Sequence, residues 1–213
     1  MMETIIMHID LLPLALVWIV MMSVMMMPSS LPVISLFHQV SLKRHQNAQW
    51  LSLNFMLGYF GIWLVFSLIL AILQWGIQRS VLLSFTSLEQ QRFAAGLFII
   101  AGLYQLSWWK NACLTRCRTP LGFIMNSWQK GWNGAISMGF KYGLICLGCC
   151  WALMLLMLGI GTMSLIGMLI ITALVTAEKL LPVNPRYISG ISGIFLLIWA
   201  GYLLSMGSNR FPV

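Results

Sequence analysis

The chain has 213 residues, of which 60% are hydrophobic and only 8% are charged, against about 25% charged residues in an ordinary soluble domain. Twelve Lys and Arg residues face four Asp and Glu residues, which gives a net charge of +8. These values exclude a soluble globular protein, a disordered chain and a secreted disulfide scaffold. We expect an all-α, polytopic membrane helical bundle that forms a single integral membrane domain over residues 1–213.

Long uncharged runs predict the membrane spans, because a helix needs about 20 mostly apolar residues to cross the hydrocarbon core. The run 142–177 is too long for a single crossing, and we expect it to break at the turn-like cluster of Gly159, Gly161 and Thr162. Six spans are therefore predicted, at approximately 11–37, 50–77, 93–109, 136–158, 163–181 and 187–209.

The basic residues predict the orientation of the bundle. With six spans, the loops at 38–49, 110–135 and 178–186 lie on one side, and with Lys141 they carry nine basic residues. The opposite side carries three, which are Arg79, Arg92 and Arg210. The excess places the first side in the cytoplasm and both termini outside it. The basic residues are spread over three short loops, so a nucleic-acid partner is not expected, whereas the lipid bilayer is.

Acidic residues and histidines are too few, and too far from the predicted span centres, for several kinds of chemistry. The carboxylates are those of Glu3, Asp10, Glu89 and Glu178, and none is predicted at mid-span. Carboxylates within the membrane usually mark proton or cation pathways. A carboxylate-based carrier and an enzyme with paired acids are therefore disfavoured. We expect Glu178 and Lys179 to form a charge pair at the membrane interface, with the lysine reaching toward the headgroups.

The five cysteines fall into two groups, one directly after span three and one early in span four. They are Cys113, Cys117, Cys146, Cys149 and Cys150. If the helix after span three continues to Pro120, the first two thiols share one face. All five belong to the predicted cytoplasmic half, where disulfides are disfavoured, so metal binding or redox chemistry is favoured.

Methionines extend this pattern along the spans. Cys146, Cys150 and Met154 form a stripe with a spacing of four residues, and Met22 and Met26 repeat that spacing at a similar depth in span one. Thiolates and thioethers select Cu(I), whereas thiolates alone also suit Zn or an Fe–S cluster. A packing role stays open, because Met and Cys are common in apolar cores. The candidate metal ligands are Cys113, Cys117, Cys146, Cys149, Cys150, Met154, Met22 and Met26.

Several motifs resemble a known bacterial family. They are the string Gly-Leu-Tyr-Gln-Leu-Ser at 102–107, Lys-x-x-Cys-Leu-x-x-Cys-Arg-x-Pro at 110–120, Cys-Leu-Gly-Cys-Cys-Trp-Ala-Leu-Met at 146–154, Gly-x-Met at 161–163 and Glu-Lys at 178–179. The Met-Met-Met-Pro-x-x-x-Pro segment at 25–32 belongs with them. Together they resemble the domain-of-unknown-function 2182 family, which is described as predicted metal-binding integral membrane proteins. The resemblance implies an inner (cytoplasmic) membrane location and metal binding by the five cysteines.

The leading functional hypothesis is an integral membrane protein that handles a soft metal, Cu(I) above others, in delivery, export or insertion. A structural Zn or Fe–S site is the simpler version of the same hypothesis. A non-catalytic subunit or assembly factor of a larger membrane complex and a thiol–disulfide redox protein are the alternatives. An enzymatic role is not favoured. A larger membrane complex or a metallochaperone is the expected protein partner.

Overall fold

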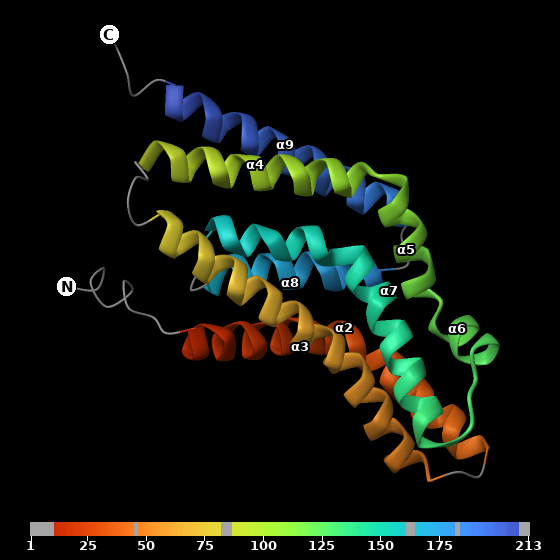
Figure 1. The fold of residues 1–213 in the computed structure, drawn as a ribbon. Helices are drawn as coiled ribbons and strands as arrows, with labels where there is room; N and C mark the ends of the chain where they lie inside the picture. Colours follow the sequence, from red (N-terminus) through yellow and green to blue (C-terminus); the bar gives the residue numbers. More distant parts are fainter. Residues whose placement is uncertain (1–10, 45–46, 82–86, 161–164, 182–183, 209–213) are drawn as a thin grey trace.

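The computed structural model describes residues 11–44, 47–81, 87–160, 165–181 and 184–208, and all regular structure within these ranges is helical. The all-α fold class is therefore confirmed for the described residues. The helices are α2 (Leu11–Lys43), α3 (Ala48–Val81), α4 (Ser87–Leu106), α5 (Trp108–Arg118), α6 (Pro120–Asn126), α7 (Gly131–Ile160), α8 (Leu165–Leu180) and α9 (Pro185–Ser208) (Figure 1).

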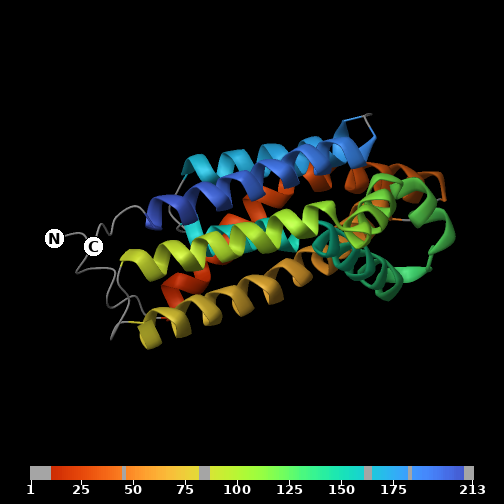
Figure 2. The same cartoon turned by 90° about the horizontal axis from the view of Figure 1, so that it is seen from above.

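Six long helices alternate in direction along an elongated bundle. The beginnings of α2, α4 and α8 and the ends of α3, α7 and α9 lie together at one end, and the short helices α5 and α6 lie at the other (Figures 1 and 2). Within the bundle α3 packs against α2 and α7, whereas α4 packs against α7 and α9. Helix α7 therefore lies in the middle and contacts elements from both halves of the chain.

The predicted count of six membrane spans is not confirmed. Among the described residues, four helical segments are long and apolar enough to cross a membrane: Leu11–Lys43, Ala48–Arg79, Gly131–Gly159 and Arg186–Ser205. Helix α8 has 16 described residues, which reach about 24 Å at the α-helical rise. Helix α4 has 20 residues but begins with a polar, charged turn that contains Glu89 and Arg92, which lowers its hydropathy.

The predicted break in the long uncharged run is confirmed in position. Helix α7 ends at Ile160 and α8 begins at Leu165, so one continuous helix does not extend over 142–177. Gly161 and Thr162 of the predicted turn lie outside the described residues, whereas Gly159 still belongs to α7. Helix α8 returns antiparallel to α7, as expected for a helical hairpin (Figure 1).

Helix α2 continues through two internal prolines, Pro28 and Pro32, and ends only at Lys43. Proline removes a backbone donor and bends a helix, and Figure 1 shows α2 changing direction along its length. The Ser29 hydroxyl donates to the Met26 carbonyl at 3.1 Å, which gives a carbonyl of the bent segment an additional partner. The bent segment thus places Ser29 inside the bundle, where it is 8% exposed.

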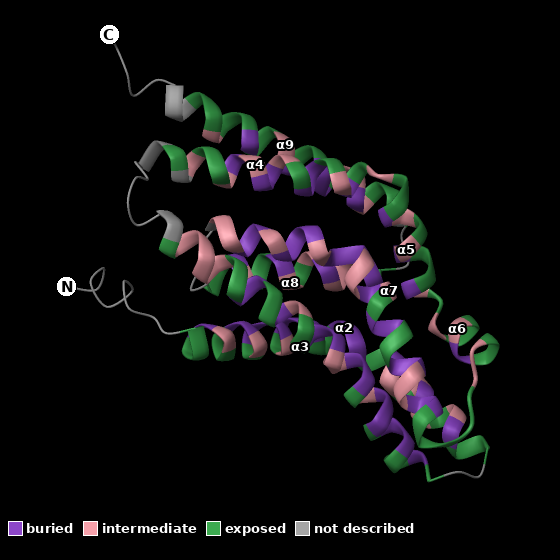
Figure 3. Ribbon diagram, in the orientation of Figure 1, coloured by how far each residue is buried: buried purple, intermediate pink, exposed green. Residues whose placement is uncertain are grey.

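Buried residues follow the facing sides of α2, α3 and α7, and exposed residues lie on the outer faces of the bundle (Figure 3). Many of these exposed residues are large and apolar. Leu165, Ile166 and Ile191 are each more than 70% exposed, for example. A soluble monomer rarely exposes extended apolar surface, whereas a bundle surrounded by lipid does. The surface is therefore consistent with a membrane protein.

Candidate metal centre

Helix α5 carries the first pair of cysteines to the bundle. Ser107 separates it from α4 and caps it, since the Ser107 hydroxyl accepts a hydrogen bond from the Trp109 backbone N–H at 3.1 Å. The expected continuation to Pro120 is not observed, because α5 ends at Arg118 and Pro120 begins α6. Proline is favoured at the first position of a helix, where its missing N–H is not needed. Cys117 is nevertheless on the buried face of α5.

Helix α7 carries the other three cysteines, all turned into the bundle. Cys146, Cys149 and Cys150 are 1–2% exposed, and Met154 continues the same face with no exposure at all. The thiols of Cys149 and Cys150 each donate to the Cys146 carbonyl oxygen at 3.0 Å. These two thiols therefore have acceptors on their own helix, whereas the Cys146 sulfur faces other elements.

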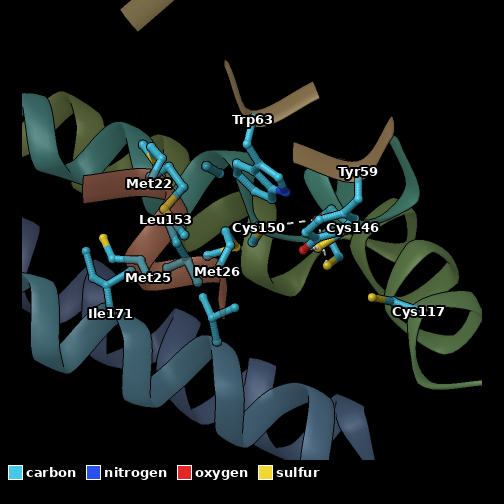
Figure 4. Close-up of a cluster of buried hydrophobic side chains, with 14 of the residues drawn as sticks. Met22, Met25, Met26, Tyr59, Trp63, Cys117, Cys146, Cys150, Leu153 and Ile171 are labelled. Atoms are coloured by element: carbon cyan, nitrogen blue, oxygen red, sulfur yellow. Dashed lines mark hydrogen bonds between the residues drawn. The ribbon is translucent and has the colours of Figure 1, made fainter. Parts of the chain in front are cut away.

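The thiol of Cys117 on α5 meets the thiols of α7. Hydrogen bonds to Cys146 and Cys149, followed by burial, raise the pKa of Cys117 well above its ordinary value. Figure 4 shows the Cys117 side chain pointing toward Cys146. Sulfurs from two separate helices thus converge, and we call Cys117, Cys146, Cys149 and Cys150 the sulfur site.

Cys113 lies at the edge of this arrangement. It is only partly buried, and its sulfur packs on Gly148, 3.2 Å from the position that a Cβ atom at Gly148 would occupy. The absence of a side chain at Gly148 therefore permits α5 to lie close to α7. Of the five predicted cysteine ligands, four are buried in the core and Cys113 lies at its edge.

The three predicted methionines belong to the same buried core as the sulfur site. Met22, Met26 and Met154 have no exposed surface. In Figure 4 the labelled sulfur-bearing side chains follow one another from Cys117 through Cys146 and Cys150 to Met26 and Met22. The thioethers of α2 and the thiols of α7 therefore belong to one buried cluster.

Sequence reasoning missed the polar partners of Cys146. The Lys179 ammonium from α8 donates to the Cys146 sulfur at 2.9 Å and to the Ser29 hydroxyl at 3.2 Å. The Tyr59 hydroxyl from α3 lies 3.1 Å from the same sulfur. The Cys146 sulfur is therefore approached by an ammonium and a phenol, an environment that stabilises a thiolate. Tyr142 completes the surroundings by donating to the Cys117 carbonyl at 2.9 Å.

A buried ion pair lies beside the sulfur site. Lys110 on α5 donates to both carboxylate oxygens of Glu178 on α8 at 2.7 Å, and the two side chains are 0% and 2% exposed. Gln105 and Ser189 add hydrogen bonds to the same carboxylate at 3.1 and 3.2 Å. Burial lowers the pKa of Lys110, and the neighbouring carboxylate opposes that shift. The pair ties α5 to α8 one residue from Lys179.

The expected interfacial pairing of Glu178 with Lys179 is wrong. Both residues are buried, Glu178 pairs with Lys110, and Lys179 contacts sulfur. Adjacent residues of a helix project in different directions, so Glu178 and Lys179 contact different helices and residues. One signal was present in the sequence, since Lys110 precedes Cys117 by two helical turns and therefore shares its face.

The set of candidate metal ligands that lie together is small within the described residues. Within the described residues, no group of three or more His, Cys, Asp or Glu side chains is arranged to hold a metal ion. A closed structural zinc site needs four such ligands. Cys117 and Cys146 are the two buried thiols that donate to no carbonyl of α7, and they come from different helices. Two converging sulfurs suit Cu(I), which thiolate and thioether ligands select.

A comparison with protein families gives a match to nearly the whole chain. A family model described as "PpoB2: Copper chaperone" matches residues 15–203. This name differs from that of the family that the sequence motifs resemble, but both descriptions involve metal binding. No curated protein and no solved structure matches the chain significantly. The matched range contains every cysteine and every methionine of the candidate metal centre.

Proposed function

The chain belongs to the PpoB2 copper chaperone family, and on that premise we propose that it carries Cu(I) inside a membrane and passes it to a partner. Copper is the cargo in this proposal and not a resident cofactor. The observation that supports it most is that Cys117 from α5 and Cys146 from α7 belong to one buried cluster, with the Cys117 side chain pointing toward Cys146 (Figure 4). A metal ion held there is shielded from water and from hard competing ligands.

The sulfur-bearing residues have successive roles in this proposal. Cys113, at the rim, exchanges copper with a donor. Cys117 and Cys146 then hold the ion, Cys146 as the thiolate beside Lys179 and Cys117 with release of its thiol proton to the medium. Each transfer is a ligand exchange in which a new metal–sulfur bond forms as an old one breaks, so copper stays Cu(I). Cys149 and Cys150 line the same site. Met26, Met154 and Met22 then offer neutral thioethers, which bind Cu(I) without adding buried charge.

The distribution of basic residues supports an orientation in the bacterial inner membrane. The α5 and α6 end of the bundle carries the excess of Lys and Arg and is placed in the cytoplasm, with both termini outside. The partly exposed Cys113 then faces the compartment where a soluble metallochaperone would supply copper. An acceptor, either a single protein or a larger membrane complex, would take it from the methionine side.

The test is the copper content of the purified chain. We expect the wild type, purified in detergent under reducing conditions, to hold about one Cu(I) per chain, because two thiolates form a complete soft-ion site. Cys117→Ser and Cys146→Ser should lose this copper. Cys113→Ser is the matched control on the same helix as Cys117, and it should retain copper at equilibrium while loading more slowly.

Two results would contradict the proposal. One is the absence of copper from wild-type protein, and the other is equal copper in a chain with Cys146, Cys149 and Cys150 all changed to serine. The alternative, a subunit of a larger membrane complex, is tested by isolation in mild detergent. It predicts that other protein chains co-purify stably with this one, whether or not copper is present.

A further inference from the structure

Lys179 carries a buried positive charge that no carboxylate of the described residues neutralises. The buried charged residues of the described chain are Lys110, Glu178 and Lys179, and Glu178 already binds Lys110 through both oxygens. Among the described residues, Lys179 donates hydrogen bonds to the Ser29 hydroxyl and the Cys146 sulfur. A buried ammonium without a counter-charge is strongly unfavourable. The counter-charge must therefore come from the sulfur site.

The position of this charge is fixed from two sides. Ser29 lies next to Pro28 in the bent part of α2 and receives the Lys179 N–H at 3.2 Å. The neighbouring Glu178 is held by Lys110, which anchors the end of α8 against α5. Lys179 therefore cannot move to solvent without breaking the packing of the bundle. The Lys179 nitrogen therefore stays beside the Cys146 sulfur.

The sum of charges then determines which ion the site accepts. Two thiolates contribute two negative charges, and Lys179 contributes one positive charge, so an ion of charge +1 makes the buried assembly neutral. A divalent ion would leave one net positive charge in a medium of low dielectric constant, which is unfavourable. A third thiolate would restore neutrality, but Cys149 and Cys150 use their S–H groups to donate to the Cys146 carbonyl.

From this balance we infer that Lys179 is the residue that makes the sulfur site selective for monovalent soft ions over divalent soft ions such as Zn(II) and Cd(II). The inference rests on the proposed function and adds the reason why that site takes Cu(I). Binding forms one metal–sulfur bond to the Cys146 thiolate, which already faces the Lys179 ammonium, and one to Cys117, whose thiol proton is released to the medium, and no electron is transferred. Lys179 acts on the ion through the charge of the assembly and is not itself a ligand.

The experiment compares a monovalent with a divalent probe on the full chain in detergent. Ag(I) and Cd(II) are titrated against competing chelators into the wild type, Lys179→Met and Lys179→Arg. We expect the wild type and Lys179→Arg to prefer Ag(I) strongly. In Lys179→Met the ratio of Ag(I) to Cd(II) affinity should fall by about 100-fold or more, since the unbalanced charge now favours the divalent ion.

A purely structural role for Lys179 gives a different result. In that case Lys179→Met would lower the affinities for Ag(I) and Cd(II) by the same factor, so their ratio would stay unchanged. That outcome overturns the inference. If Lys179→Met does not fold, the wild type decides, because equal affinity for Ag(I) and Cd(II) overturns the inference without any variant. Wild-type protein that binds neither Ag(I) nor Cu(I) contradicts the proposed function itself.

Discussion

Five cysteines of one chain have different chemical surroundings, and those surroundings separate their roles. Cys146 faces an ammonium and a phenol, Cys149 and Cys150 donate to a backbone carbonyl, and Cys113 is partly exposed. The sequence predicted all five as ligands and divided them only into one group after span three and one group early in span four. Their spacing predicts a shared helix face, but the partner of each sulfur is supplied by a helix distant in the chain.

Thiol accessibility tests this distinction between residues. In the folded protein without metal, we expect a maleimide to modify Cys113 and to leave the four cysteines of the sulfur site unmodified, since they are at most 5% exposed. Peptide mass spectrometry identifies the labelled position, and labelling after denaturation gives the full count of five. Rapid native labelling of Cys146 or Cys149 would contradict the buried sulfur site.

At the scale of elements, α5 is joined to α8 by an ion pair that is removed from water. Deleting one partner of such a pair leaves an unpaired buried charge and costs about 3–5 kcal/mol, whereas replacing both with apolar residues is often neutral. We therefore expect Lys110→Met and Glu178→Leu each to destabilise the bundle strongly. The double variant should recover most of the loss in thermal unfolding. If the loss of stability in the double variant equals the sum of the losses in the two single variants, the two residues are not coupled.

The close contact of α3 with α7 depends on a glycine. A Cβ atom at Gly58 would meet the Ile136 carbonyl oxygen, whereas one at Gly61, a turn further along α3, would have nothing within 4 Å. We expect Gly58→Ala to lower the free energy of unfolding by about 1–3 kcal/mol, as overpacking does. Gly61→Ala, the matched control, should be neutral or stabilising. Equal effects in the two variants would contradict the observed packing.

Helices were predictable from the sequence to the extent that apolar runs define them. The uncharged runs located α2, α3, α7 and α9, and the glycine cluster after Leu158 located the end of α7. The burial of Lys110 and Glu178 was not predictable, because each charge is tolerated only through a partner 68 residues away. A rule that places every lysine on the surface fails where a lysine on one helix forms a buried ion pair with a carboxylate on another helix.

The sulfur chemistry changes along the whole molecule: Figure 4 shows Cys117 and Cys146 at one side of the buried cluster and Met22 and Met25 at the other. A topology reporter placed at Met125, an exposed position of α6, should report the cytoplasm, because the positive-inside rule assigns that end to it. A reporter at the C-terminus should report the opposite side. A reading outside the cytoplasm at Met125 would instead place the thiols toward an oxidising compartment and favour a redox protein.

X-ray absorption at the copper edge, recorded on wild-type protein loaded under reducing conditions, tests the central claim most directly. The copper should be Cu(I), coordinated by sulfur alone with about two nearest ligands, as a site of soft ligands requires. The Cys146→Ser variant should lack this signal. A first coordination shell of nitrogen or oxygen in the wild type, or an unchanged sulfur shell in Cys146→Ser, would contradict copper binding at the sulfur site.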